Sequence, residues 1–280
     1  MKTPSPRTTK PARPASAQGK RMNSLEKMLG LLDVFTLAAP AWSTEDLIRY
    51  SGCTRSTCYR YIKVLQGAGF LTPVAQGSYI LGPRIIELDR NVRMCDPVYT
   101  AGGPPMQRLA AKTGQSALLC MLFSDTVMCV REELNRSAPG GLFSRGQKRP
   151  LFSGAASKVI LANLPAHQLR NLFARHRKPI AAAGLGADWV SFRKALRQIR
   201  QDGYCMSAGE FATGIVGIAA PLFNGAGSVL GSLGIAMSAS SAHRSEYPAL
   251  AKAVVKAAQE ATARICSGDH GVDLPARAVG

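Results

Sequence analysis

A short run in the first third of the chain carries a dense set of side chains that can bind nucleic acid. Arginine guanidinium groups can read guanine O6 and N7 as a bidentate pair, and hydroxyl groups hold phosphate oxygens. Cys58, Ile62 and Leu65 recur at helical spacing, so they predict a buried helix face behind a polar one, with Thr54 as the capping residue. The polar face carries Arg55, Ser56, Thr57, Tyr59, Arg60 and Lys63.

These six side chains, together with Arg84, are the predicted DNA contacts. We expect Arg55 and Arg60, with Thr57 beside them, to read base edges. The phosphate contacts would come from Ser56, Tyr59 and Lys63. Two alternatives stay open: Tyr59 could pack against the first helix, and Arg84 could pair with Glu87 instead of a phosphate.

The charge of the chain favours a polyanionic partner. The 280 residues include 35 Lys and Arg against 17 Asp and Glu, a formal net charge of +18. No acid occurs between Leu47 and Ile86, although five bases do; a chance cluster on a basic protein is the plain alternative. Residues 1–21 hold six bases and no acid among prolines and serines, which predicts a disordered tail that is either a DNA-binding arm or a solubilising leader.

Other kinds of chemistry are poorly represented, so we expect no catalytic residue, no metal and no cofactor. The seven cysteines are scattered and odd in number, which is typical of free thiols in the reducing cytoplasm. The four histidines suggest no triad, Ala155 interrupts a Ser-x-x-Lys motif, and no phosphate-binding loop occurs. There is no secretory signal and no apolar run of about 18 residues that would span a membrane, so the expected location is cytoplasmic.

The elements around the basic run predict a small DNA-binding domain. A Leu-rich helix follows its proposed N-cap, Ser24, and Ser43 opens a second helix with acids in its first turn. The third helix follows Thr54, and the extended runs 70–74 and 78–81 suggest a hairpin. Three helices and a hairpin in this order make a winged helix-turn-helix.

The rest of the chain predicts an α+β domain around an antiparallel sheet. Residues 84–94 suggest a linking helix, and Gly102–Pro105 should interrupt the helix that follows. Strands are expected near 117–123, 126–131, 215–223 and 229–237, the last two joined by a hairpin turn at Asn224. Helices are expected at 155–162, 165–175, 188–202 and 250–266, the second of them with Pro165 in its first position.

Six passages in this order resemble the IclR family of bacterial transcriptional regulators, over about residues 24–267. Three lie in the first domain: the opening at Ser24, the third helix with its exit at Gly69, and the segment 79–84. Three lie in the second domain: residues 155–158, 201–204 and 214–221. One such passage would be weak, whereas six in order are specific.

The resemblance implies a two-domain α+β protein with an N-terminal winged helix-turn-helix and a C-terminal GAF-like effector domain. The expected parts are a disordered tail (1–21), a DNA-binding domain (22–83), a linker helix (84–100), an effector-binding and oligomerisation domain (101–268) and a flexible tail (269–280). The resemblance also implies homodimers or homotetramers that bind palindromic operators, and a small organic-acid or aromatic effector. The family pocket maps here onto Leu142, Arg149, Ala155, Ala156, Ser207, Ile215 and Gly217.

The pocket positions depart from the family pattern toward less polar residues. Phe152 stands where a histidine is usual, Ser157 where a glycine is usual, and the usual acidic stretch is reduced to Glu210. An anion would need Arg145, Lys148 or Arg149 near the amides that start the helix at residue 155; a solvated basic loop is the alternative. Two functions therefore remain: a ligand-responsive regulator, and a DNA-binding protein whose second domain only oligomerises.

Overall fold

The structure is a computed structural model, and it describes residues 23–134 and 144–268. The chain divides into two compact units, with the division between Val92 and Arg93. The predicted tails and the pocket residue Leu142 lie outside the described residues. None of the helices in the described ranges is both long and apolar enough to cross a membrane.

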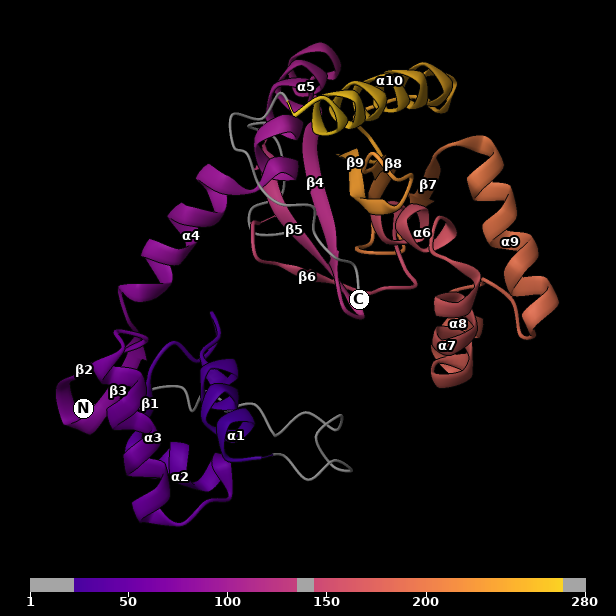
Figure 1. The fold of residues 1–280 in the computed structure, drawn as a ribbon. Coiled ribbons are helices and arrows are strands. Elements are labelled where there is room, and N and C mark those ends of the chain that lie inside the picture. Colours follow the sequence, from indigo (N-terminus) through magenta and orange to yellow (C-terminus); the bar gives the residue numbers. More distant parts are fainter. Residues whose placement is uncertain (1–22, 135–143, 269–280) are drawn as a thin grey trace, which may run out of the picture. The chain divides into compact units, whose positions relative to one another are not determined.

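The first unit is a three-helix domain with a small sheet (Figure 1). Helix α1 (Ser24–Gly30) runs into a 3-10 turn (Leu31–Val34), and α2 (Thr44–Ser51) and α3 (Arg55–Gly67) follow. Strands β1 (Trp42–Ser43), β2 (Leu71–Val74) and β3 (Ser78–Leu81) pair antiparallel in the order β1-β3-β2. The predicted winged helix-turn-helix is confirmed, with the short strand β1 added to its hairpin.

The start of α1 differs from the expectation. Asn23, not Ser24, is the N-cap, because its side chain accepts the amide of Glu26 while the Glu26 carboxylate accepts the amide of Asn23. This reciprocal capping box satisfies two amides at once, which a lone serine hydroxyl does not. Ser24 is left free to bond Tyr61 on α3, with 2.8 Å between their hydroxyl oxygens.

Helix α4 (Arg84–Cys95) and helix α5 (Pro97–Thr113) connect the hairpin to the second sheet. The expected interruption at Gly102–Pro105 is wrong: α5 continues through both prolines, and the expected boundary between residues 100 and 101 lies inside it. Helix α5 buries Val98, Met106 and Leu109 against the sheet. This tertiary burial outweighs the backbone hydrogen bonds that the prolines remove.

The second unit is built on a six-stranded antiparallel sheet in the order β6-β5-β4-β9-β8-β7. The strands are β4 (Ser116–Phe123), β5 (Thr126–Glu133), β6 (Lys148–Arg149), β7 (Cys205–Ala208), β8 (Ile215–Phe223) and β9 (Val229–Ser238). The predicted turn after β8 is confirmed: the Asn224 carboxamide oxygen accepts the amides of Ala226 and Ser228. The expected α+β class with an antiparallel sheet is therefore confirmed.

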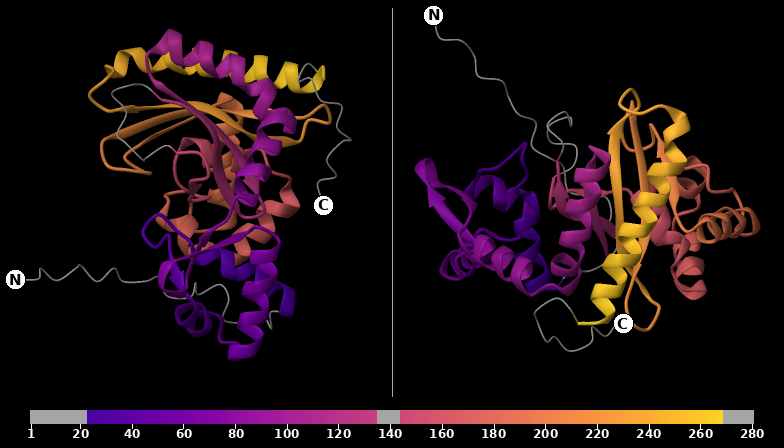
Figure 2. Two further views of the ribbon diagram at one scale, coloured as in Figure 1. Left: turned by 90° about the vertical axis from the view of Figure 1, so that its left-hand side faces the viewer. Right: turned by 90° about the horizontal axis from the view of Figure 1, so that it is seen from above.

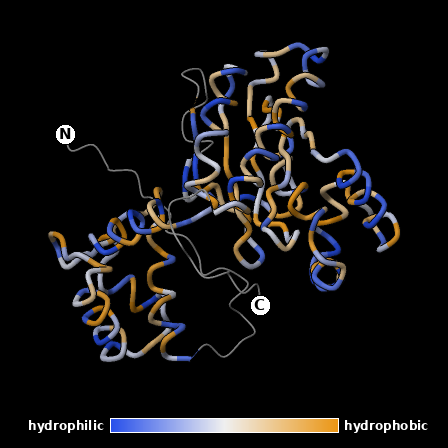
Figure 3. The backbone as a smooth tube through the Cα atoms, turned by 45° about the horizontal axis from the view of Figure 1, so that its top comes forward, coloured by the Kyte–Doolittle hydropathy of each residue, from blue (hydrophilic) through white to orange (hydrophobic). Residues whose placement is uncertain are grey.

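Helices cover the two faces of this sheet. Helices α5 and α10 (Tyr247–Cys266) pack along one face, as Figure 2 shows. The other face carries α6 (Ala155–Ala162), α7 (Ala166–Arg175), α8 (Arg177–Ala182) and α9 (Trp189–Asp202). Helix α8 was not anticipated, and Pro165 is the N-cap of α7 rather than its first residue. Figure 3 shows hydrophobic colour along the strands and hydrophilic colour on the outer helices.

Candidate nucleic-acid interface and ligand pocket

The connection between α2 and α3 sets the direction of the basic helix. Gly52 ends α2 with a left-handed backbone (φ +63°), and its amide donates to Ile48 at 3.3 Å. Thr54 then caps α3 by accepting the amide of Thr57 at 3.4 Å. A left-handed glycine is the usual way to stop one helix and turn into the next.

Helix α3 separates its apolar and polar side chains as expected. Cys58, Ile62 and Leu65 are buried, and Tyr61 is buried with them. Thr57 is half-buried, and the other predicted contacts on this helix are exposed: Arg55, Ser56, Tyr59, Arg60 and Lys63. The alternative that Tyr59 packs against the first helix is wrong, because Tyr61 occupies that place.

Two arginines among the predicted DNA contacts pair with carboxylates of the protein. Arg55 lies 3.4 Å from the Glu45 carboxylate on α2, and its guanidinium stands 5.7 Å from the centre of the Tyr59 ring. Arg84 donates to the Glu87 carboxylate at 2.8 Å, which is the pairing that the sequence left open as an alternative to a phosphate contact. Both pairs are largely exposed, so DNA phosphates or bases can compete for these arginines at small cost.

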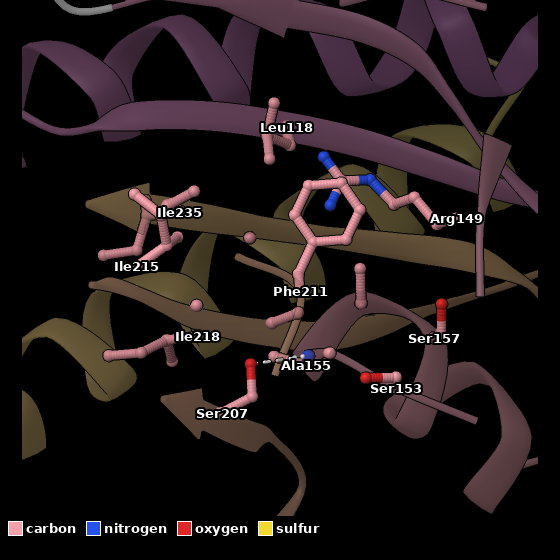
Figure 4. Close-up of a pocket in the computed structure, with 16 residues that line it drawn as sticks. Leu118, Arg149, Ser153, Ala155, Ser157, Ser207, Phe211, Ile215, Ile218 and Ile235 are labelled. Atoms are coloured by element: carbon pink, nitrogen blue, oxygen red, sulfur yellow. Dashed lines mark hydrogen bonds between the residues drawn. The ribbon is translucent and has the colours of Figure 1, made fainter. Parts of the chain in front are cut away.

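In the second unit, a pocket lies between α6 and the sheet. Every described residue of the expected effector set lines it: Arg149, Ala155, Ala156, Ser207, Ile215 and Gly217. The structure adds polar side chains from Ser153 and Ser157 and an apolar wall of Leu118, Ile218 and Ile235. Figure 4 shows these side chains converging from both layers.

The start of α6 is held by side chains from across the pocket. The amide of Ala155 donates to Ser207 Oγ at 2.9 Å, and the amide of Gly154 donates to Glu210 Oε2 at 2.9 Å (Figure 4 draws the first bond). Gly154 has φ +84°, a conformation that favours glycine. Strand β7 and the loop after it are therefore fastened to the N-terminus of α6.

Glu210 also forms a part-buried ion pair. The Lys158 ammonium donates to Glu210 Oε1 at 2.8 Å, and the two side chains are 11% and 30% exposed. Ser153 Oγ donates to the Glu210 carbonyl at 3.0 Å. The loop from residue 209 to 214 is thus anchored at three atoms of Glu210 beside the pocket.

Phe211, the next residue, fills much of the pocket. The Arg149 guanidinium stands 4.4 Å from the centre of the Phe211 ring, and Figure 4 shows the two groups stacked beneath Leu118. The space left beside the ring is about 40 Å³, room for a few water molecules.

The polar groups of the pocket fit an anion with an apolar body. Arg149 is 8% exposed and presents a cation among apolar residues. The Ser157 hydroxyl, in a residue that is 1% exposed, makes no hydrogen bond with any described residue. A buried hydroxyl and a buried guanidinium that line the same pocket can bind a carboxylate, while the isoleucines contact hydrocarbon.

Of the three bases that the sequence offered for binding an anion, Arg149 lines the pocket, and Arg145 and Lys148 do not reach it. Successive residues of a strand point to opposite faces, and Lys148 is exposed where Arg149 is buried. Arg145 donates to the carbonyl of Val130 at 2.7 Å and stands 5.5 Å from the centre of the Tyr99 ring on α5.

Sequence reasoning did not assign Glu210 or Phe211 to the site. Both lie in a short polar connection between strands, where a lone aromatic residue is a weak signal of a ligand contact. Within the described ranges, no three His, Cys, Asp or Glu side chains come together as a metal site. The seven cysteines are free thiols.

Comparison with known proteins matches both units. Residues 24–75 match the family model described as the IclR helix-turn-helix domain, and residues 96–263 match the model described as the C-terminal domain of the bacterial transcriptional regulator IclR.

Curated relatives align over most of the chain. The regulator KipR of Bacillus subtilis is 25% identical over 71% of this chain and 79% of its own length. The regulator XynR of Escherichia coli is 24% identical over 76% and 85%. The repressor AllR of Klebsiella pneumoniae is 23% identical over 84% and 86%.

Solved structures share the fold. A transcriptional regulator of a Silicibacter species has a TM-score of 0.73 at 24% identity and covers 90% of this chain and 98% of its own. An IclR homologue of Microbacterium hydrocarbonoxydans, solved with 4-hydroxybenzoate, has a TM-score of 0.71 at 18% identity and covers 87% and 99%.

Proposed function

Because the chain belongs to the IclR family of bacterial transcriptional regulators, we propose that it binds a palindromic operator through α3 and that a small apolar carboxylate controls this binding. The family makes it a DNA-binding regulator and not an enzyme. The observation that carries the effector assignment is the buried Arg149 guanidinium, which lines a largely apolar pocket and stacks on the ring of Phe211.

On the DNA side, α3 supplies the base contacts. Arg60 is exposed on the polar face of α3, and Arg55 can exchange Glu45 for a guanine. Thr57 lies beside these arginines. The phosphate contacts come from Ser56, Tyr59, Lys63 and Arg84. A regulator of chromosomal operators acts in the bacterial cytoplasm, and we place this protein there. We assign it the role of a repressor because the relative AllR is named a repressor.

On the ligand side, an aromatic or branched aliphatic monocarboxylate fits best. Its carboxylate would bind Arg149 and Ser157, and its hydrocarbon would replace the Phe211 ring against Ile215 and Ile235. The 4-hydroxybenzoate bound by the Microbacterium homologue has this chemistry. Displacement of Phe211 leaves the Arg149 cation in a low-dielectric site, where an anion interacts strongly.

Dimers would form through α4. Ile85, Leu88, Val92 and Cys95 follow a three-four spacing along this helix, which has no buried residue in the single chain. Leu88 is 37% exposed and Val92 is 49% exposed. An exposed apolar stripe with this spacing is typical of a helix that pairs with a copy of itself. Two copies then present two α3 helices to the two halves of a palindrome; a tetramer is a pair of such dimers.

A short path can carry the ligand signal toward α4. Arg149 and Arg145 belong to one segment, residues 144–149; the first lies in the pocket and the second lies over Tyr99 in the first turn of α5. Arg131 stands on the same ring at 5.0 Å. If a ligand moves Arg149, this segment shifts Arg145 on the Tyr99 ring and so displaces the start of α5. Because α5 comes directly after α4 in the chain, this displacement can be passed on to α4. Half-site spacing then changes.

A second function, oligomerisation without any effector, is favoured by the small space of about 40 Å³ left in the pocket beside the Phe211 ring. A thermal-shift screen of organic acids separates the two functions. Stabilisation by an apolar carboxylate that is lost in Arg149→Gln supports the regulator. No stabilisation over a broad panel, for the parent and for Phe211→Ala alike, supports the second function.

The DNA assignment is tested by gel shift on the region upstream of the protein's own gene, with scrambled DNA as competitor and at several salt concentrations. Arg60→Ala should weaken specific binding by about 1–3 kcal/mol, roughly 5- to 150-fold, and relax sequence preference. Equal binding to both DNAs that fades with salt, unchanged in Arg60→Ala, would contradict base reading by α3.

A further inference from the structure

Helices α7, α8 and α9 of the second unit carry a strongly basic surface that the effector pocket does not use. Their eight Lys and Arg residues are all exposed, against the two acids Asp188 and Asp202. No acidic residue occurs between Glu133 and Asp188. We call this set the α7–α9 basic face: Arg170, Arg175, Arg177, Lys178, Arg193, Lys194, Arg197 and Arg200.

Aromatic packing brings bases of different helices together. The Arg177 guanidinium stands 5.4 Å from the centre of the Phe173 ring, and that of Arg193 stands 5.8 Å from the centre of the Trp189 ring. The two rings are in edge contact, with their centres 5.7 Å apart. Bases from α8 and α9 therefore border one aromatic pair, and Figure 1 shows the three helices grouped together.

The bases of α9 form a continuous stripe. Arg193, Arg197 and Arg200 recur at steps of four and three, on the flank of the helix next to the buried Phe192 and Leu196. Of the eight bases, Arg175 alone is ion-paired with a carboxylate of a described residue, Asp125 at 2.8 Å. A solvated helical surface normally carries both signs of charge in similar numbers, whereas this one carries eight bases against two acids.

We propose that the α7–α9 basic face binds DNA phosphates outside the base pairs that α3 reads. Six of the eight bases are arginine, whose planar guanidinium suits phosphate oxygens. Among the large apolar side chains of these described helices, Val190 is the exposed one, so the face lacks the apolar anchors of a membrane-binding surface. This inference rests on the proposed function, since DNA bound by α3 is tethered to the chain that carries this face.

The test measures affinity for a random-sequence 80-base-pair duplex against salt concentration, using the full chain. The variant Arg193→Gln/Lys194→Gln/Arg197→Gln removes three charges of α9. A matched variant, Lys112→Gln/Lys252→Gln/Lys256→Gln, removes three exposed charges from α5 and α10 on the other side of the sheet. Both variants are also made in an Arg60→Ala/Lys63→Ala background.

The slope of log K against log salt is negative, and each lost phosphate contact reduces its magnitude by about 0.9. Three lost contacts therefore reduce that magnitude by up to about 2.7. We expect this loss for the α9 variant in both backgrounds and a much smaller one for the matched variant. Equal losses would show a general effect of net charge and overturn the proposal. Unchanged DNA binding with lost binding to phosphatidylglycerol vesicles would assign the face to membranes instead. Failure of the parent to bind any DNA would overturn the proposed function as well.

Discussion

The ion pair between Lys158 and Glu210 allows a quantitative test of how the loop from residue 209 to 214 is anchored beside the pocket. Removing one partner of a fully buried pair costs about 3–5 kcal/mol, because the other charge is left uncompensated. Glu210 is 30% exposed and Lys158 is 11% exposed, so solvent recovers part of this cost. The variant Glu210→Gln keeps an acceptor for the Gly154 amide, and we expect a loss of about 2 kcal/mol.

The assay is urea unfolding followed by tryptophan fluorescence. The chain has two tryptophans, Trp42 in the first unit and Trp189 in the second, so a Trp42→Phe background reports on the second unit. A double-mutant cycle with Lys158→Met and Glu210→Gln should give a coupling of about 1–2 kcal/mol. The double variant should be more stable than Glu210→Gln alone, because no buried charge is then left unpaired.

Two results would refute this reasoning. A coupling below about 0.5 kcal/mol would mean that the pair contributes little to stability. A double variant that is less stable than Glu210→Gln would mean that Lys158 stabilises the fold through its packing and not through its charge. If the pair does close the loop, Glu210→Gln should also bind an apolar carboxylate more tightly, since less free energy is spent on opening.

Three further predictions test the core, the thiols and the dimer. Gly234→Ala should destabilise the second unit by about 3 kcal/mol in thermal unfolding, because its new Cβ meets backbone of the adjacent strand; Gly225→Ala, in open space, should change little. Burial raises the pKa of the Cys205 thiol to about 12 from 9.0, so iodoacetamide at pH 8 should modify the exposed Cys95 and spare Cys205. The stability that this buried thiol contributes is present below pH 9 and is lost as the pH rises to 12. Cys205→Ala should therefore flatten the dependence of the unfolding free energy on pH between 9 and 12. Val92→Glu should convert a dimer to a monomer in sedimentation velocity; an unchanged dimer would place the interface elsewhere than α4.

Sequence alone was enough for the three helices and the hairpin of the first unit, although not for the N-cap at Asn23 or for strand β1, because the signals of those elements are local. The cap at Thr54 and the buried spacing of Cys58, Ile62 and Leu65 lie within one helix and its flanking turn. Short-range caps and periodicity depend on residues a few positions apart, so they can be read without knowledge of distant contacts. The α+β class of the second unit followed similarly from strand spacing and the turn at Asn224.

The family resemblance indicated six of the sixteen residues that line the pocket, and the tertiary structure supplied the others and decided which bases reach it. Arg149 reaches the pocket and Lys148 does not, because a strand alternates its side chains between faces. Glu210 and Phe211 join the site by contacts to residues more than fifty positions away, which no local pattern encodes. Helix α5 likewise runs through two prolines because the sheet offers it an apolar surface to bury against. Burial and long-range pairing are properties of the packed chain, and at these positions they outweigh local preference.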